Sequence, residues 1–320
     1  MKLGLMMAVL GGMKLNEALD QVKALGLDTV EIGTGAYPGD PHCDVKTLLR
    51  NEKKREEFLE AIRSRGLEIS AFACHGNMLH PDPAIGKVHD RVFNDTILLA
   101  EKCGVKVINN FSGTPAGSPT DKVPNWIVCP WPPDFAEALK YQWEKKLIPY
   151  WKKMNRVLGD HGVKAALEMH PNFCVYNPET LLRLRQECGK NIGCNFDPSH
   201  LFWQGIDPCA ALRVLKEAVF HVHAKDTKIY DWNCKVNGVL DTKSYLDEVN
   251  RSWIFRSVGY GHGWDFWADF VSTLRLIGYD GTLSIEHEDS LMSGPEGLDK
   301  ALKVLKDLVI REKAGAAWWA

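Results

Sequence analysis

The sequence predicts a single-domain (β/α)8 barrel, and three observations favour this fold class. Strand-like and helix-like segments alternate along the whole chain in eight β-then-α units. Several strand-like runs are continuously apolar and end in acids or histidines, which is typical of parallel strands with both faces buried and a site at the carboxyl end. No GxGxxG motif follows the first strand, so an open doubly wound sheet is disfavoured.

Length and composition agree with one soluble domain over residues 1–320. The chain is 45% apolar and 25% charged, with 39 basic and 41 acidic residues, so its net charge is −2. A protein that binds duplex nucleic acid is expected to carry a basic excess or stripe, and none is present. No apolar run approaches the roughly 20 residues of a membrane span. Nine cysteines without a CxxC spacing predict a reduced, cytoplasmic protein with no disulfide framework.

The first four units are delimited by glycines that end helices and by polar residues that end strands. Gly26, Gly66 and Gly104 each follow a helix-like segment, as glycine does at helix C-termini. The predicted strands cover residues 3–9, 29–32, 68–74 and 105–111. The predicted helices cover residues 15–25, 52–65, 85–103 and 135–161.

The last four units follow the same alternation. Gly162 ends the long amphipathic helix before the fifth strand, and Pro178 is suited to the first turn of the next helix. The predicted strands cover residues 164–169, 192–196, 219–224 and 282–285. The predicted helices cover residues 178–188, 208–216, 264–277 and 296–311.

Two long segments interrupt the alternation, over residues 112–133 and 228–263. The first is rich in Pro, Gly and Trp, and the second contains Asn and Gly as well as Trp232. Loops of more than about 12–15 residues in a compact domain are often functional lids, so both are expected to lie over the mouth of the barrel. Their aromatic residues and Trp203 could stack on sugar rings or form subunit contacts.

Four strand ends carry residue types that bind divalent metals. The runs are Ala-Ala-Leu-Glu-Met-His-Pro (165–171), Cys-Asn-Phe-Asp-Pro-Ser-His (194–200), His-Val-His-Ala-Lys-Asp (221–226) and Leu-Ser-Ile-Glu-His-Glu-Asp (283–289). Strands five to eight are neighbouring strands of the barrel, so their carboxyl ends lie around the same opening. Glu168, Asp197, His223 and Glu286 are therefore candidate ligands.

An oxygen-rich set with a single imidazole suits Mn²⁺, Mg²⁺ or Co²⁺, with Zn²⁺ as an alternative. Each acid taken alone could instead cap a helix or pair with a basic residue. Four ligand-type residues at matched strand ends favour a site, because strand-end carboxylates in barrels usually serve chemistry. Mn²⁺ is the expected ion.

The order Glu, Asp-x-x-His, His, Glu on successive late strands resembles the xylose isomerase-like barrel superfamily, in particular its sugar (phosphate) isomerase/epimerase branch. The segments Phe-Asp-Pro-Ser-His (196–200), His-Val-His-Ala-Lys-Asp (221–226) and Ser-Ile-Glu-His-Glu (284–288) carry the resemblance, which covers nearly the whole chain. The branch includes ketose 3-epimerases, hydroxypyruvate isomerase and inosose dehydratase, and endonuclease IV is a distant relative.

The resemblance implies that Glu168, Asp197, His223 and Glu286 are metal ligands. It also implies that Glu168 and Glu286 act as acid and base, and that His200 contacts the substrate. The expected activity is isomerisation or epimerisation of a ketose-like carbohydrate through an enediolate. Analogy with related barrels adds the expectation of a homo-oligomer.

Other polar residues near the mouth have more than one interpretation. His75 and Asn110, near the ends of the third and fourth strands, are candidate substrate-binding residues, and so is Lys225; Glu31 has the same ambiguity. Lys225 and Asp226 could bind a substrate hydroxyl or pair with each other. The glycine-rich turn at residues 259–263, which contains His262, could approach a phosphate or only reverse the chain.

Three further functions are compatible with the pattern to different degrees. A lyase, dehydratase or glycoside-cleaving enzyme could use the same enolisation on a keto-sugar or inosose, followed by loss of a β-leaving group. Nucleic-acid repair in the manner of endonuclease IV needs a three-metal site and a basic surface, which the near-neutral charge disfavours. A metal-binding module without catalysis is the remaining alternative.

Overall fold

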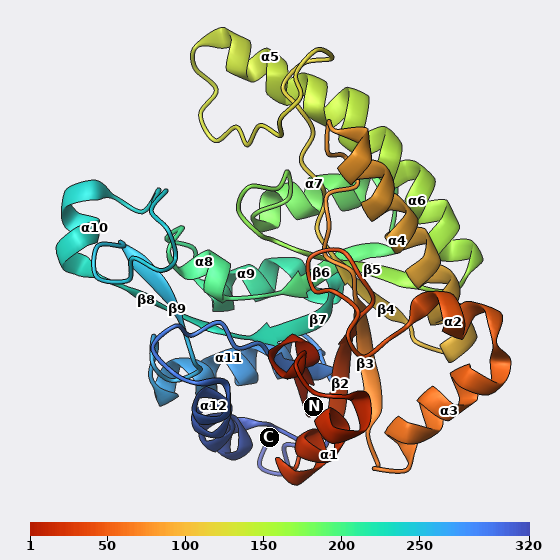
Figure 1. The fold of residues 1–320 in the computed structure, drawn as a ribbon. Coiled ribbons are helices and arrows are strands. Elements are labelled where there is room, and N and C mark those ends of the chain that lie inside the picture. The colour runs from red at the N-terminus through yellow and green to blue at the C-terminus, as the bar shows by residue number, and fades with distance from the viewer.

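The computed structural model describes residues 1–320, and its centre is a closed barrel of eight parallel strands surrounded by helices (Figure 1). The predicted (β/α)8 fold is therefore confirmed. The strands in chain order are β1 (Lys2–Met6), β2 (Thr29–Gly33), β3 (Glu68–Ala73), β4 (Val107–Asn110), β5 (Lys164–Glu168), β6 (Ile192–Phe196), β7 (Val219–Ala224) and β10 (Thr282–Ile285).

Closure depends on the first strand, which pairs in parallel with both β2 and β10. Leu3 lies opposite Leu283, and Leu5 lies opposite Val30 in the neighbouring strand. These residues belong to one contiguous core of 63 buried residues, which joins the inside of the barrel to the inner faces of the helices. Because all strands are parallel, their carboxyl ends open at a single rim.

The helices begin and end where local chemistry favours it. Asp82 and Asn177 accept hydrogen bonds from Ala84 N and Thr180 N at the first turns of α4 (Pro83–Cys103) and α7 (Pro178–Cys188), and Gly104 ends α4 with φ of +75°. The outer helices are α1 (Leu15–Ala24), α2 (Val45–Arg50), α3 (Glu52–Arg63), α4 (Pro83–Cys103), α5 (Pro133–Tyr141), α6 (Ile148–Asp160), α7 (Pro178–Cys188), α8 (Ser199–Phe202), α9 (Pro208–Leu215), α10 (Asp231–Asn237), α11 (Trp264–Leu276) and α12 (Gly294–Leu308).

Two predicted elements have different internal structure. The first strand ends at Met6 rather than continuing to residue 9, and a 3₁₀ turn, Met7–Leu10, follows it. The helix predicted over 135–161 consists of α5, a π-helical turn (Gln142–Leu147) and α6. Pro149 lies in the first turn of α6 and has no N–H to donate, so the regular ladder cannot pass through it. Figure 1 shows the resulting rod extending past the barrel rim.

The segment 228–263, expected as a loop, contains a β-ribbon and a helix. Strand β8 (Asp226–Ile229) pairs antiparallel with β9 (Trp253–Arg256), and α10 lies between them in sequence. The two strands are four residues each and stand far apart in the chain, so no local pattern links them. The short helices α2 and α8 were also not predicted. In contrast, residues 112–132 contain no helix or strand, as expected.

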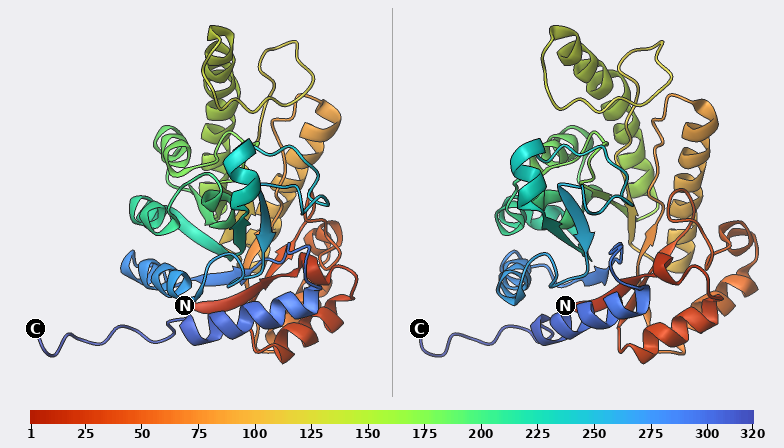
Figure 2. Two further views of the ribbon diagram at one scale, coloured as in Figure 1. Left: turned by 90° about the vertical axis from the view of Figure 1, so that its left-hand side faces the viewer. Right: turned by 60° about the vertical axis from the view of Figure 1, so that its left-hand side comes forward.

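The remaining features concern the outside of the molecule. None of the helices combines the length and apolar character that a bilayer span requires. The residues after α12 lead away from the barrel in both views of Figure 2. Trp318 and Trp319 in this tail are 87% and 74% exposed, so they pack on no part of the barrel.

Candidate metal centre

The four side chains predicted as ligands converge at the rim of the barrel. One donor atom from each of Glu168, Asp197, His223 and Glu286 can be chosen so that all lie within 4.8 Å of one another. His223 Nδ1 lies 3.1 Å from Glu286 Oε2 and 3.3 Å from Glu168 Oε2. The arrangement follows from the register, because each residue ends its parallel strand or follows it directly, apart from His223 near the end of β7.

Glu168 is the most heavily contacted of these carboxylates. Its Oε1 lies 3.0 Å from His200 Nε2, and its Oε2 accepts a hydrogen bond of 3.0 Å from Asn195 Nδ2. Burial by itself would raise the pKa of Glu168, but the adjoining imidazoles of His200 and His223 outweigh it and hold the pKa well below its usual value. Glu168 is therefore ionised at neutral pH and available as a ligand or a base.

Two buried polar atoms at this centre have no hydrogen-bond partner. Asp197 Oδ2 lies 3.0 Å from Lys225 Nζ, and His75 Nε2 lies 3.1 Å from Glu168 Oε2, but neither contact has the angle of a hydrogen bond. Buried polar atoms are nearly always satisfied. The Asp197 oxygen and the His75 nitrogen that lack hydrogen bonds lie among the candidate ligands. A set of three carboxylates and an imidazole suits a divalent cation.

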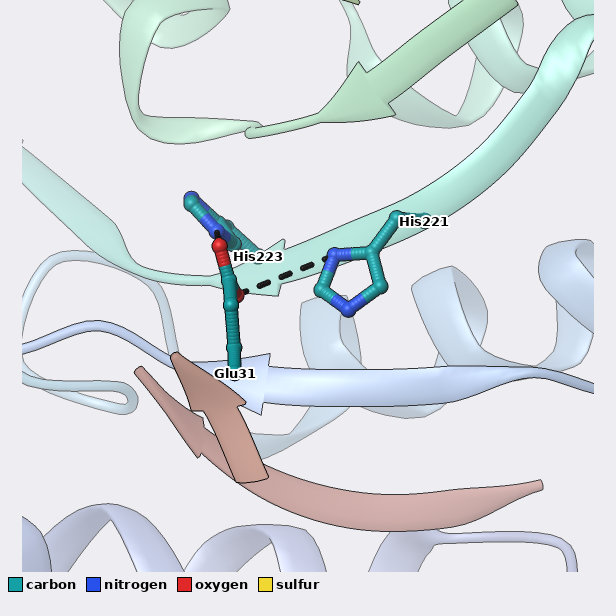
Figure 3. A group of neighbouring side chains, drawn as sticks. All are labelled: Glu31, His221 and His223. Atoms are coloured by element: carbon teal, nitrogen blue, oxygen red, sulfur yellow. Dashed lines mark hydrogen bonds and ion pairs between the residues drawn. The ribbon is translucent and has the colours of Figure 1, made fainter. Parts of the chain in front are cut away.

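A second group holds the far side of the His223 ring. Glu31, on β2, lies with its Oε2 2.9 Å from His223 Nε2 and 3.9 Å from His221 Nδ1 (Figure 3). The same carboxylate accepts hydrogen bonds of 2.8 Å from Asn109 Nδ2 and Ser284 Oγ. The Glu31 carboxylate is thus fully hydrogen-bonded, and it orients the His223 imidazole.

The charge state of this group follows from its surroundings. Burial alone would raise the pKa of Glu31, but the positive charge of His223, together with that of His221 once it is protonated at acidic pH, lowers it to about 2. Burial lowers the pKa of His221 to about 4, so at neutral pH this ring is uncharged. Burial also opposes the charged form of His223, yet Glu31 and Glu286 outweigh it and raise its pKa. A metal ion bound at His223 Nδ1 would replace the proton that this nitrogen carries in the charged imidazole.

Lys225 lies inside the cluster, with its ammonium in contact with carboxylates. Its Nζ lies 2.7 Å from Glu286 Oε2 and 3.0 Å from both Glu288 Oε2 and Asp197 Oδ2. It also sits 4.7 Å from the centre of the Phe255 ring. Against the effect of burial, Lys225 holds the pKa of Glu286 well below its usual value. Lys225 therefore neutralises the acidic rim.

Asp226 has neither of the two roles considered for it, which were binding a substrate hydroxyl and pairing with Lys225. Its carboxylate accepts hydrogen bonds from the backbone N–H groups of Gly259 (3.2 Å), Gly261 (3.0 Å) and His262 (2.8 Å). The N–H groups of the glycine-rich turn are thus occupied by this chain's own carboxylate. The suggestion that the turn approaches a phosphate is wrong for that reason, and Asp226 is a clamp between β8 and the turn.

The predicted substrate-binding residues differ in their surroundings. His75 and Lys225 line the cavity at the metal centre, which has a volume of about 220 Å³, and His200 contacts Glu168 beside it. Asn110 uses its side-chain oxygen to accept hydrogen bonds from Gly76 N (3.1 Å) and Phe111 N (2.8 Å), while its Nδ2 is buried without a partner. Asn110 thus holds the backbone after β3, and its role in binding stays a prediction.

Two contributors were missed in the sequence. Asn195 contacts both Glu168 and His223, and Asn109 contacts Glu31 and His221. Both are fully buried strand residues: Asn195 stands two positions before Asp197, and Asn109 is the last residue but one of β4. The period of two in a strand could have indicated Asn195, because Asp197 shares its face.

The fold and the centre together define a (β/α)8 barrel with a carboxylate–imidazole site at the carboxyl ends of its strands. The chain belongs to the xylose isomerase-like TIM barrel family, whose sequence profile matches residues 19–308. The protein YfiH of Bacillus subtilis (strain 168) is 42% identical over 312 residues, which cover 97% of this chain and 99% of YfiH.

Solved structures share the fold at low sequence identity. The probable 3-DHS dehydratase AsbF from Bacillus anthracis has a TM-score of 0.66 at 17% identity, with 96% of this chain and 99% of AsbF covered. The IOLI protein with a binding zinc atom has a TM-score of 0.66 at 19% identity, with 97% and 98% covered. A D-tagatose 3-epimerase-like protein has a TM-score of 0.64 at 20% identity, with 96% and 97% covered.

Proposed function

We propose that the protein is a divalent-metal-dependent isomerase or epimerase that acts on a ketose-like sugar or sugar derivative. The observation that carries the proposal is the position of Glu168 and Glu286, whose carboxylates both lie within 3.3 Å of His223 Nδ1 but come from strands on either side of β7. Family membership supports it, and structures that share the fold include an epimerase-like protein.

Glu168, Asp197, His223 and Glu286 would hold the ion, which we propose is Mn²⁺. The oxygen-rich donor set supports this choice, and Asp197 Oδ2, which makes no hydrogen bond although it lies 3.0 Å from Lys225 Nζ, supports an ion at this place. When bound, such an ion supplies electrostatic stabilisation for negative charge on the substrate oxygens.

The chain's own residues would move the protons. One glutamate removes the proton from the carbon next to the carbonyl, so that the C–H electron pair moves into an enediolate. The other glutamate, after taking a proton from solvent, delivers it to the opposite face, which inverts the centre. His200 and Asn195 keep Glu168 in place through their contacts of 3.0 Å, and Lys225 does the same for Glu286.

Proton exchange in heavy water tests this function. The Mn²⁺-loaded protein is incubated with a panel of ketoses and inososes, and deuterium incorporation is measured by mass spectrometry and NMR. We expect deuterium at the carbon next to the carbonyl in at least one compound, and loss of that signal in Glu168→Gln and Glu286→Gln. Glu137→Gln, on the exposed face of α5, is the control. Absence of exchange in every compound would contradict the proposal.

A lyase or dehydratase acting on a keto-sugar or inosose is the second candidate. A cavity of about 430 Å³ beside the metal centre favours it, because this space exceeds what a free monosaccharide bound at the ion would use. The same incubations separate the two reactions. Deuterated substrate or epimer without elimination supports the isomerase, whereas an unsaturated product or a released leaving group supports the lyase.

A further inference from the structure

A large aromatic cavity adjoins the cavity at the metal centre. The two have volumes of about 430 Å³ and 220 Å³, and His170 lines both. His200 also lines the larger cavity, while its Nε2 lies 3.0 Å from Glu168 Oε1. The two cavities are therefore neighbours that share the His170 side chain.

The walls of this cavity come mainly from the two segments that interrupt the barrel. The stacked pair Trp203–Trp253, with ring centres 4.7 Å apart and planes 5° from parallel, forms one part. Trp126 from the loop at 112–133 forms another. The barrel strands contribute no wall residue, so the space exists because of the insertions. Further lining residues are Val128, Leu240, Tyr245 and Arg251.

The charged groups of the cavity are already engaged by contacts within the chain. Asp241 accepts hydrogen bonds from Ser252 N (2.7 Å) and Lys243 N (3.0 Å), and Lys243 Nζ lies 2.9 Å from its carboxylate. The Arg251 guanidinium donates to the backbone oxygens of Trp253 and Lys243. Arg251 has no carboxylate partner, but its guanidinium is 1% exposed and held by backbone oxygens, so it presents little donor surface to an occupant, and a neutral ring is preferred to a phosphate.

Two neutral donors, in contrast, have no partner. The indole N–H groups of Trp126 and Trp203 are buried and make no hydrogen bond, whereas Trp253 Nε1 donates to Val239 O at 3.0 Å. Trp203 is only 4% exposed. A buried indole usually finds an acceptor. A neutral ring that carries oxygen atoms would pack against these aromatic side chains, and a small turn of either indole toward the cavity would bring its N–H group to an oxygen of that ring.

We infer that this cavity is a subsite for the second ring of a neutral glycoside. The keto-sugar ring would lie at the metal centre, and the second ring, either a sugar or a phenolic aglycone, would lie against Trp126 and the Trp203–Trp253 pair. The inference rests on the proposed function, in which Glu168 and Glu286 act on the first ring. Pockets that bind small molecules usually have volumes of roughly 300–1,000 Å³. The volume of the cavity at the metal centre lies below this range, and that of the aromatic cavity lies within it.

Calorimetric titration of the Mn²⁺-loaded, full-length protein tests the subsite without any need for turnover. The probes are methyl β-D-glucopyranoside, which has one ring, and cellobiose and 4-hydroxyphenyl β-D-glucopyranoside, which have two. We expect at least one two-ring probe to bind about tenfold more tightly than the one-ring probe. Preference for cellobiose identifies a second sugar, and preference for the phenolic probe identifies an aryl glycoside. Equal affinity for all three probes would overturn the inference.

Variants of the unpaired indoles give an independent measurement. Trp126→Phe and Trp203→Phe keep an aromatic ring and remove the N–H donor, so they should weaken two-ring binding about three- to tenfold and leave methyl β-D-glucopyranoside unaffected. Trp232→Phe is the matched control, because Trp232 is 65% exposed in the same insertion and lines neither cavity. Should Trp203→Phe unfold, Trp126→Phe alone decides, and unchanged binding of the two-ring probe refutes the subsite.

The outcomes also separate this inference from the proposed function. Two-ring binding without deuterium exchange in any compound keeps the subsite and rejects the isomerase. Exchange on free ketoses combined with equal affinity for one- and two-ring probes keeps the isomerase and rejects the subsite.

Discussion

His223 Nε2 lies 2.9 Å from Glu31 Oε2, and this contact directs the other ring nitrogen toward Glu168 and Glu286. A carboxylate behind a metal-binding imidazole selects its tautomer and increases its basicity. Glu31 therefore contributes to the candidate centre without being one of its proposed ligands.

Glu31→Gln should weaken metal binding while the barrel stays folded. The amide keeps the size of the side chain but loses the charge that holds His223, so we expect Mn²⁺ affinity to fall about 10- to 100-fold. Calorimetric titration of the metal-free protein with Mn²⁺ measures this change, and circular dichroism monitors the fold. Glu137→Gln should bind Mn²⁺ as the unaltered protein does. Unchanged affinity in Glu31→Gln would show that Glu31 does not orient the imidazole.

Lys225→Met should destabilise the metal-free protein and increase its response to metal. Without the ammonium, Glu286, Glu288 and Asp197 lose their shared counter-charge, and breaking such a buried pair costs about 3–5 kcal/mol of unfolding free energy. Added Mn²⁺ should raise Tm more than in the unaltered protein, because the cation takes over part of the neutralisation.

Differential scanning calorimetry with and without Mn²⁺ checks this prediction. Lys303→Met is the control, since Lys303 is 73% exposed and pairs only with Asp299. An equal rise of Tm in Lys225→Met and the unaltered protein would mean that Lys225 and the ion do not share the same carboxylates.

Asp226→Asn should lower stability through the glycine-rich turn. The carboxylate accepts hydrogen bonds from three backbone N–H groups of the turn and from Trp267 Nε1 at 3.3 Å. An amide at this position brings an NH₂ group against these donors, so the free energy of unfolding should drop by about 1–3 kcal/mol. Urea titration measures the loss, with the exposed Asp231→Asn as control. A stability equal to that of Asp231→Asn would contradict the clamp.

Asp289 should make a pH-dependent contribution to stability. Burial opposes its ionisation, but hydrogen bonds from Ser257 N (2.8 Å) and Arg256 Nε (3.0 Å) outweigh burial and lower its pKa below the ordinary 3.8. A carboxylate whose pKa is lower in the folded protein stabilises it above the unfolded value, and this stabilisation is lost as the pH falls through the folded value.

Asp289→Asn should accordingly be about 1–3 kcal/mol less stable than the unaltered protein at pH 7. The difference should narrow as the pH is lowered below 3.8, where the natural carboxyl group also becomes protonated. Urea unfolding over a range of pH provides the comparison, and Asp299→Asn, 60% exposed, serves as the reference variant. A difference that stays constant with pH would refute a role for the charge.

Much of the barrel was predictable because its signals are local. The bounds of α7, β6, β7 and β10 agree with those predicted, since prolines, glycines and apolar runs delimit them. The β8–β9 ribbon was not predictable, because its strands are only four residues long and lie on either side of a long irregular segment. The π-helical turn before Pro149 was not predictable either, because the amphipathic pattern is uniform on both sides of it.

The sequence by itself determined the eight βα units and which acids end the strands, because strand period and parallel topology bring strand ends to one rim. It also singled out Glu168, Asp197, His223 and Glu286 as candidate ligands, and their role stays a prediction. Only the tertiary structure decided which side chains support them. Glu31 contacts His223, which is 192 positions away in the chain. The Asp226 side chain bonds to the turn at 259–263 instead of facing the mouth of the barrel. Such pairings depend on barrel closure and on atomic distances between remote segments, which no local pattern encodes.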